Sequence, residues 1–151
     1  MVIKKIGANE REAALDLALS VFMQYEAPDY SEQGIKSFTD FINANKEAND
    51  FLEIYGAYKD DAIIGVIATR NNDNHIALLF VEGKYHNQGI GRNLFDTIVL
   101  QKTRGDKITV NSSPFAVGFY KKMGFIPDSE EQIADGIRFT PMTYLHKRSK
   151  Q

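Results

Sequence analysis

The chain of 151 residues contains no cysteine and has three histidines. Without cysteine, it forms neither a disulfide framework nor a site in which a thiolate binds a metal or attacks a substrate. No two of the histidines, His75, His86 and His146, stand at the spacing of paired metal ligands. We therefore expect no metal site, and we place the histidines on the surface or in loops.

The sequence also lacks a net basic charge and a long apolar run. Its formal net charge of -2 argues against a nucleic acid held by backbone electrostatics. Charges interrupt the apolar runs of residues 1–19, which predict neither a signal peptide nor a membrane span. We expect a cytoplasmic protein with a small-molecule ligand, no nucleic-acid or membrane partner, and a solvated basic tail at residues 147–150.

Residues 76–94, IALLFVEGKYHNQGIGRNL, combine a strand, a glycine loop and the start of a helix. The apolar run 76–81 has the length of a strand that is covered on both faces. After Gly89 and Gly91, apolar residues recur at a helical period, so the glycines lie where a helix begins. Unpaired N–H groups and the helix dipole favour an anion there, and missing Cβ atoms let phosphate oxygens approach the main chain. The first hypothesis is a phosphate-bearing ligand.

The length and the order of elements predict one domain, residues 1–151. The first half is expected to contain a strand at 2–6, a helix capped by Asn9 and ended by Pro28, a helix capped by Ser31, and strands at 51–58, 62–69 and 75–81. The second half is expected to begin with a helix to about Arg104 that is ended by Gly105, and a strand at 107–110. A helix at 114–123 follows, capped by Ser112 or Ser113 and ended by Gly124. The last expected elements are a strand starting at Phe125 or Ile126, a polar loop at 128–135 and a strand at 137–145. Tight turns make the three central strands an antiparallel meander, and the helical crossover makes the strand at 107–110 parallel to the third.

Ligands in sheets of this kind bind beyond the carboxyl ends of strands, which here lie near Glu82 and Asn111. A second candidate region is segment 26–32, EAPDYSE, in which Glu26, Asp29 and Glu32 accompany aromatic residues. These carboxylates either attract a cationic substrate or are solvated loop charges, and the sequence leaves both interpretations open.

Two known phosphate-binding motifs do not match the glycine loop. A dinucleotide fingerprint needs a third glycine at position 94, which is Leu94, and a phosphate loop of nucleotide hydrolases needs Gly-Lys-Ser/Thr, which is absent. Both motifs also belong early in a mainly parallel sheet, whereas this loop follows three antiparallel strands.

The stretches LLFVEGKYHNQGIGRNLF and ITVNSSPFAVGFYKKMGF resemble the GCN5-related N-acetyltransferases (GNAT). The resemblance covers residues 51–125 well and the flanking helices loosely. The family loop reads Arg or Gln, two residues, Gly, one residue, then Gly or Ala. His86 here replaces the usual Arg or Gln, which leaves the role of this side chain open but keeps the backbone cradle.

The resemblance implies a mixed α/β fold whose mostly antiparallel sheet, flanked by helices, has parallel strands at 75–81 and 107–111 that splay apart to hold acetyl-CoA. The amides from Gln88 to Arg92 would hold the pyrophosphate, with added charge from Lys84 and Arg92, and backbone groups of Leu79 and Val81 would bind the pantetheine arm. The implied coenzyme-binding residues are Leu79, Phe80, Val81, His86, Asn87, Gln88, Gly89, Ile90, Gly91, Arg92, Asn111, Ala116 and Phe119. Asn111 has the alternative role of a turn residue that caps the next helix.

Acetyl transfer to an amine needs a neutral nucleophile, stabilisation of an oxyanion and a proton for the departing thiolate. Tyr120 matches the family position of the general acid, although a core aromatic is the alternative interpretation. Glu82 is the first candidate base and Glu53 the second, and an amine that binds partly deprotonated needs neither. The oxyanion donor is expected to be a backbone N–H, such as that of Val81.

The resemblance also implies an acceptor groove made by the first two helices and the last strands. Candidate acceptor-binding residues are Tyr25, Tyr30, Phe38, Arg138 and Phe139, with Arg138 either binding a carboxylate or pairing with an acid of the chain. The main hypothesis is an N-acetyltransferase that acts by direct attack in a ternary complex on an amine of a small molecule or peptide. The alternatives are a non-catalytic coenzyme A sensor or interaction module, and an enzyme using another acyl-CoA or a hydroxyl acceptor. The sequence does not identify the acceptor, and it is compatible with a homodimer.

Overall fold

The computed structural model describes residues 1–70, 74–102 and 105–145. His146, the basic tail and Arg104 lie outside these residues. The strands are β1 (Val2–Lys5), β2 (Glu53–Lys59), β3 (Ala62–Arg70), β4 (His75–Val81), β5 (Lys107–Ser112), β6 (Ile126–Pro127), β7 (Gln132–Ala134) and β8 (Ile137–Leu145). The α-helices are α1 (Arg11–Tyr25), α2 (Glu32–Ala44), α3 (Ile90–Leu94), α4 (Leu100–Lys102) and α5 (Val117–Met123), with shorter helical turns η1 (Ala8–Glu10), η2 (Ala27–Asp29), η3 (Gly83–Tyr85) and η5 (Pro114–Ala116) and a π-helical turn η4 (Phe95–Val99) that joins α3 to α4.

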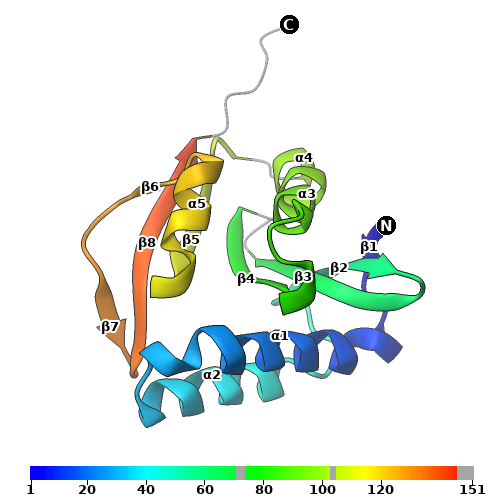
Figure 1. Ribbon diagram of the computed structural model, residues 1–151, viewed down its shortest axis with the longest axis horizontal. Coiled ribbons are helices and arrows are strands. Elements are labelled where there is room, and N and C mark those ends of the chain that lie inside the picture. Colours follow the sequence, from blue (N-terminus) through cyan, green and yellow to red (C-terminus); the bar gives the residue numbers. More distant parts are fainter. Residues whose placement is uncertain (71–73, 103–104, 146–151) are drawn as a thin grey trace, which may run out of the picture.

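The described strands form a sheet in the order β1-β2-β3-β4-β5-β8-β6, and β7 pairs with β8 (Figure 1). Neighbouring strands are antiparallel except β4 and β5, which are parallel. The predicted meander and the predicted mixed, mostly antiparallel sheet are thus confirmed.

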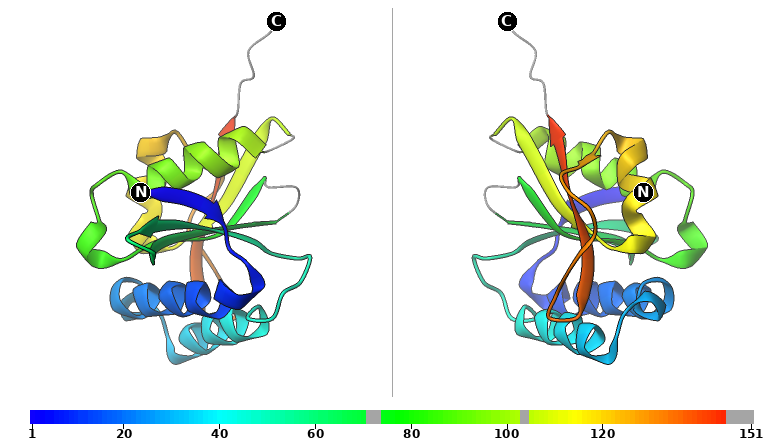
Figure 2. Two further views of the ribbon diagram at one scale, coloured as in Figure 1. Left: turned by 90° about the vertical axis from the view of Figure 1, so that its right-hand side faces the viewer. Right: turned by 90° about the vertical axis from the view of Figure 1, so that its left-hand side faces the viewer.

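Helices cover both faces of this sheet. Figure 2 shows α1 and α2 on one face, and the continuous helical segment of α3, η4 and α4 together with α5 on the other. A separate cluster of buried residues fills each interface, one centred on Leu15, Phe22 and Ile54 and one on Leu94, Phe95 and Ile108. Because both faces are covered, the interior of β2 is continuously buried rather than alternating. None of the helices among the described residues combines the length and the apolar character needed to cross a bilayer.

Three local predictions differ from the structure. Asn9 lies inside η1 and does not cap α1, because the chain enters the helix through a 3-10 turn that begins after Gly7. The first strand of the meander begins at Glu53 rather than residue 51. The expected polar loop contains β7, whose exposed residues gain their strand conformation by pairing with β8. The two strands form a hairpin across Asp135 and Gly136, which both have positive φ, and the Asp-Gly turn rather than periodicity was the signal for it.

The predicted caps at three other helix ends are present. The Ser31 hydroxyl accepts a hydrogen bond from the Gly34 N–H at 3.2 Å, and the Ser113 hydroxyl accepts one from the Ala116 N–H at 3.3 Å. Gly124 ends α5 in the left-handed conformation, with φ of 108°. Ser113 and Gly124 thus fix where the segment after β5 starts and stops, and this segment carries Tyr120.

Candidate active site

The two parallel strands separate after a short contact. β4 and β5 pair only at His75–Thr109 and Ile76–Val110, whereas β5 keeps its pairing with β8 from Lys107 to Ser112. The facing edges of β4 and β5 therefore diverge beyond Ile76 and Val110. Unpaired sheet edges of this kind can hydrogen-bond an extended ligand that carries amide groups.

A cavity of about 350 Å³ lies at this divergence and reaches the helices α1 and α2. Of the site residues predicted from the sequence, the structure brings together Tyr30, Phe38, Leu79, Phe80, Asn111, Ala116 and Tyr120 in its walls. The cavity thus joins the expected coenzyme side of the sheet to the expected acceptor side. A volume of this size is typical of a small-molecule site.

Tyr120 lies on the inner face of α5, with 5% of its surface exposed. Its ring packs edge-on against Phe119 and Phe125, with centroids 5.3 Å away in both cases. Burial, and then the negative charge of Glu26, raise the pKa of Tyr120 above its ordinary value. The phenol is therefore protonated at neutral pH, as a proton donor must be.

Glu26 is one of the three carboxylates for which the sequence left open a cation-attracting role or a solvated position, and it lies in the cavity lining. It caps the end of α1, where its N–H donates to the Phe22 carbonyl at 2.8 Å, and its side chain lines the cavity. Burial is the largest cause that raises the pKa of Glu26, to about 7; a hydrogen bond with Ser113 opposes the shift and the charge of Asp29 adds to it. The spacing of four residues from Phe22 was a usable signal, because it places Glu26 on the buried face of α1.

The glycine loop leaves its main chain open on one side. Gly89 has φ of 80°, and nothing lies within 4 Å of the position a Cβ would occupy. The next residues, Ile90 to Arg92, begin α3, so their N–H groups have no preceding helical turn to bond. The residues present therefore fit a phosphate group close to the backbone.

His86 anchors this loop to the end of β4. Its Nε2 lies 2.6 Å from the Val81 carbonyl oxygen. A carbonyl only accepts hydrogen bonds, so Nε2 carries the proton. The structure thus gives His86 a positioning contact, and it occupies the Val81 carbonyl with a bond inside the chain.

Gly91 brings α3 and α5 together. A Cβ there would lie 3.0 Å from Cζ of Phe119, so glycine allows this ring to pack on the first turn of α3. Phe119 remains 38% exposed and lies beside the loop rather than in the cavity wall.

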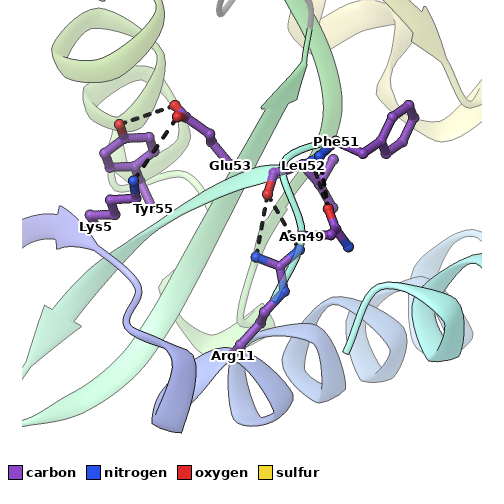
Figure 3. A network of polar contacts seen from close by, with 7 residues as sticks. All are labelled: Lys5, Arg11, Asn49, Phe51, Leu52, Glu53 and Tyr55. Carbon is purple, nitrogen blue, oxygen red and sulfur yellow. Dashed lines mark hydrogen bonds and ion pairs between the residues drawn. The ribbon is translucent and has the colours of Figure 1, made fainter. Parts of the chain in front are cut away.

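Both candidate bases named from the sequence lie elsewhere. Glu82 follows β4 outside the cavity lining, 3.9 Å from the ammonium of Lys84. Glu53 lies at the far end of β2, near Lys5 and Tyr55 (Figure 3). The structure therefore brings neither carboxylate next to Tyr120.

Three predicted acceptor residues also lie outside the cavity lining. Tyr25 packs against His86 and Phe115, with ring centroids 4.8 Å and 5.6 Å away. Arg138 pairs with Glu131 at 3.0 Å, which supports the interpretation that it pairs with an acid of the chain. Phe139 pairs with Gln132 across the β7–β8 hairpin.

The family described as acetyltransferase (GNAT) domain matches residues 26–146 of this sequence. The chain therefore belongs to the GNAT acetyltransferase family, whose members use acetyl-CoA. The resemblance noted from the two sequence stretches is confirmed. A comparison with curated proteins found no match.

Solved structures share the fold. A GCN5-related N-acetyltransferase from Rhodopseudomonas palustris is 18% identical, with a TM-score of 0.74 over 95% of this chain and 94% of that one. The PaiA N-acetyltransferase from Thermoplasma acidophilum, in complex with coenzyme A, is 21% identical, with a TM-score of 0.73 over 95% and 98% of the two chains. The apo form of YjaB from Escherichia coli is 20% identical, with a TM-score of 0.73 over 97% and 100%. At these identities the similarity shows the fold alone.

Proposed function

We propose that residues 1–151 form one acetyltransferase domain that transfers an acetyl group from acetyl-CoA to an amine by direct attack in a ternary complex. The observation that carries this proposal is the two-pair contact of β4 and β5 with a cavity beyond it. The family match supports the donor, and the glycine loop beside the divergence supports its phosphate-binding end.

The proposed roles follow from the position of each group. The backbone from Gln88 to Arg92 binds the pyrophosphate, and the edge of β4 near Leu79 binds the amide-bearing arm. Asn111 and Ala116 line the mouth of the divergence. Acetyl-CoA supplies an acetyl group that is activated as a thioester. Tyr120 donates the proton that the departing sulfur requires.

Calorimetry with coenzyme A tests the binding half of this proposal. Gly89→Val should weaken binding, because a side chain would enter the open space above the loop. Valine is also strained in the left-handed conformation of Gly89, so Gly89→Asn, which tolerates this conformation better, serves as a second variant. Gly105→Val is the matched control, since a Cβ there meets neighbours only at 3.9 Å. Unaltered affinity in both Gly89 variants would remove the loop assignment.

An assay of free thiol release with a panel of amines tests turnover. Acetylation of at least one amine is the expected result. Tight coenzyme binding without acetylation of any acceptor would instead favour the non-catalytic sensor. Competition between acetyl-CoA and longer acyl-CoA thioesters would identify the preferred donor.

A further inference from the structure

Glu26 has no cationic partner in the part of the chain that the structure describes. The groups that face it are the Ser113 hydroxyl, the Asp29 carboxylate, and the phenols of Tyr30 and Tyr120. Across residues 1–70, 74–102 and 105–145, no Lys, Arg or His side chain forms an ion pair with it. A half-buried carboxylate without a cation is unfavourable. An ammonium that enters the cavity would form the ion pair that the described residues do not supply.

The end of α1 adds to this preference. Carbonyl groups at the last turn of a helix carry a partial negative charge, which favours a cation and disfavours an anion. Glu26 caps this end, so the helix and the carboxylate both attract positive charge to the same place.

The wall next to Glu26 is aromatic. Phe22 stacks on Phe38, with centroids 3.9 Å apart and planes 11° apart, and Tyr30 meets Phe22 edge-on at 5.2 Å. Phe41 extends this wall along α2. Flat apolar surface of this kind suits an apolar or aromatic body attached to the amine.

The far end of the cavity is positive. Arg70 lies in its wall, and its Nε is buried without a hydrogen-bond partner among the described residues. Burial and the charge of Arg70 lower the pKa of the adjacent His75 to about 4, so His75 is neutral at neutral pH. A second ammonium on the acceptor would therefore meet the Arg70 cation. Asp135 is exposed at the rim, where its charge attracts a cation to the cavity but does not lie inside it.

Hydrogen bonds connect the elements that border the cavity on the proposed acceptor side. The Tyr30 hydroxyl donates to the Arg138 carbonyl at 2.9 Å, and the Arg138 guanidinium donates to the Asp29 carbonyl at 2.9 Å. The Ser37 hydroxyl donates to the Asp135 carbonyl at 2.8 Å. These bonds tie the α1–α2 loop and α2 to the β7–β8 hairpin. The cavity beneath them, of about 350 Å³, has the size of a small-molecule site.

We propose that the acceptor is a small primary monoamine with an apolar or aromatic body, and that Glu26 binds its ammonium and takes its proton. The inference rests on the proposed acetyl transfer. Glu26 accepts one proton from the ammonium, the freed nitrogen forms a C–N bond with the acetyl carbon, and the C–S bond breaks. Tyr120 gives a proton to the sulfur and regains one from the nitrogen, which becomes an amide. The net products are the acetylamide, free thiol and the proton held by Glu26, which passes to solvent.

Thiol release with 2-phenylethylamine, putrescine, spermidine and a lysine-containing peptide tests the substrate class. We expect kcat/KM for 2-phenylethylamine to exceed the others by about tenfold or more, since each misplaced charge or missing apolar contact reduces transition-state binding. A preference for the polyamines or the peptide would overturn the inference.

Glu26→Gln tests the role of the carboxylate. It should lower kcat/KM for 2-phenylethylamine by about 100-fold and abolish the rise of kcat/KM with an apparent pKa near 7 that we expect of the wild type. Glu12→Gln, the same change at an exposed position of α1, should alter neither quantity. Coenzyme A affinity, measured by calorimetry, should be unchanged in both variants.

The two proposals fail in different ways. Absence of coenzyme binding or of any acetylation overturns the proposed function and this inference together. Acetylation that is unaffected by Glu26→Gln overturns only the assignment of Glu26, and leaves the acetyltransferase in place.

Discussion

The two ends of α1 carry charges that oppose the helix dipole, Arg11 at the amino end and Glu26 at the carboxyl end. The two charged side chains differ in the partners that the rest of the chain gives them. Nε of Arg11 donates to the Asn45 carbonyl at 2.7 Å. Both terminal nitrogens of Arg11 donate to the Leu52 carbonyl at 3.3 Å, as Figure 3 shows. Glu26 accepts a hydrogen bond from the Ser113 hydroxyl and faces the carboxylate of Asp29.

A hollow also lies beside Arg11, lined by Arg11 and by the loop that precedes β2. Its buried cation is already bonded to the main chain, so it offers little to a ligand. The cavity at Glu26 has a carboxylate without a cation, a buried phenol and open strand edges. A charge in the interior thus stabilises the fold when the chain completes its hydrogen bonds, and is available to a ligand when the chain does not.

The largest expected effect is on stability at the Arg11 end. Arg11→Met keeps the apolar stem but leaves the Asn45 and Leu52 carbonyls unbonded, so the free energy of unfolding should fall by about 3 kcal/mol. Turnover per folded molecule should not change. Urea denaturation and active-site-normalised kinetics measure the two quantities. Arg11→Lys, which keeps the charge but not the fork of donors, should be intermediate. Equal stability of all three proteins would contradict the structural role.

The next effect is on turnover at the Glu26 end. Tyr120→Phe keeps the buried ring but removes the proton donor, so kcat should fall by about 100-fold while coenzyme affinity is unchanged. Tyr58→Phe is the matched control at the Arg11 end, where the Tyr58 hydroxyl donates to Glu10 at 2.9 Å. It should reduce stability by about 1 kcal/mol without lowering kcat. Full turnover in Tyr120→Phe would return Tyr120 to the role of a core aromatic.

A smaller effect, expected for Glu26→Gln, is an increase in stability, in contrast to the loss expected for Arg11→Met. The folded-state pKa of Glu26 is raised from 4.5 to about 7, so its folded carboxylate becomes destabilising as pH rises through this range. Glu26→Gln should therefore increase the free energy of unfolding by about 1 kcal/mol near pH 8 and leave it unchanged near pH 4. Urea titrations at both pH values measure this difference. A variant that is less stable than wild type at pH 8 would mean that Glu26 holds the fold as Arg11 does.

The smallest expected effect is a shift, along the pH axis, of the profile of kcat/KM. The Ser113 hydrogen bond lowers the pKa of Glu26, so Ser113→Ala should move the acid limb of kcat/KM upward by about half a pH unit. Ser113→Thr, which keeps a hydroxyl, should restore the wild-type profile. An unchanged limb in the alanine variant would show that another group sets it. The alanine variant also loses a helix cap, so its stability should be recorded alongside.

Local patterns predicted most of the fold. The meander, the parallel crossover and the caps at Ser31, Ser113 and Gly124 follow from turn chemistry and periodicity, which act over a few residues. Periodicity does not predict β7, because its exposed residues become a strand only by pairing with β8. Asn9 has the residue type of a helix cap, but it lies in a 3-10 turn that has no sequence signature of its own.

The site was predicted unevenly for the same reason. Tyr120, Asn111 and the glycine loop stand at fixed offsets in one stretch of the chain, so the motif located them. Glu82 and Glu53 lie outside the cavity lining, whereas Glu26 lines the cavity together with Tyr120. The helical spacing from Phe22 places Glu26 on the buried face of α1, but only tertiary packing brings that face close to β5 and α5.

The sequence by itself determined the family and the position of the glycine loop, and it predicted a phosphate-binding role for that loop and an acid role for Tyr120, because each depends on short-range spacing. The tertiary structure alone decided that β4 and β5 separate after Ile76 and Val110, and that Arg11 is bonded while Glu26 is not paired. Burial and the pKa of a carboxylate depend on groups that are remote in sequence, such as Ser113 and Tyr120 for Glu26. The two ends of one helix, which carry opposite charges in the sequence, thus acquire different roles only when the chain folds.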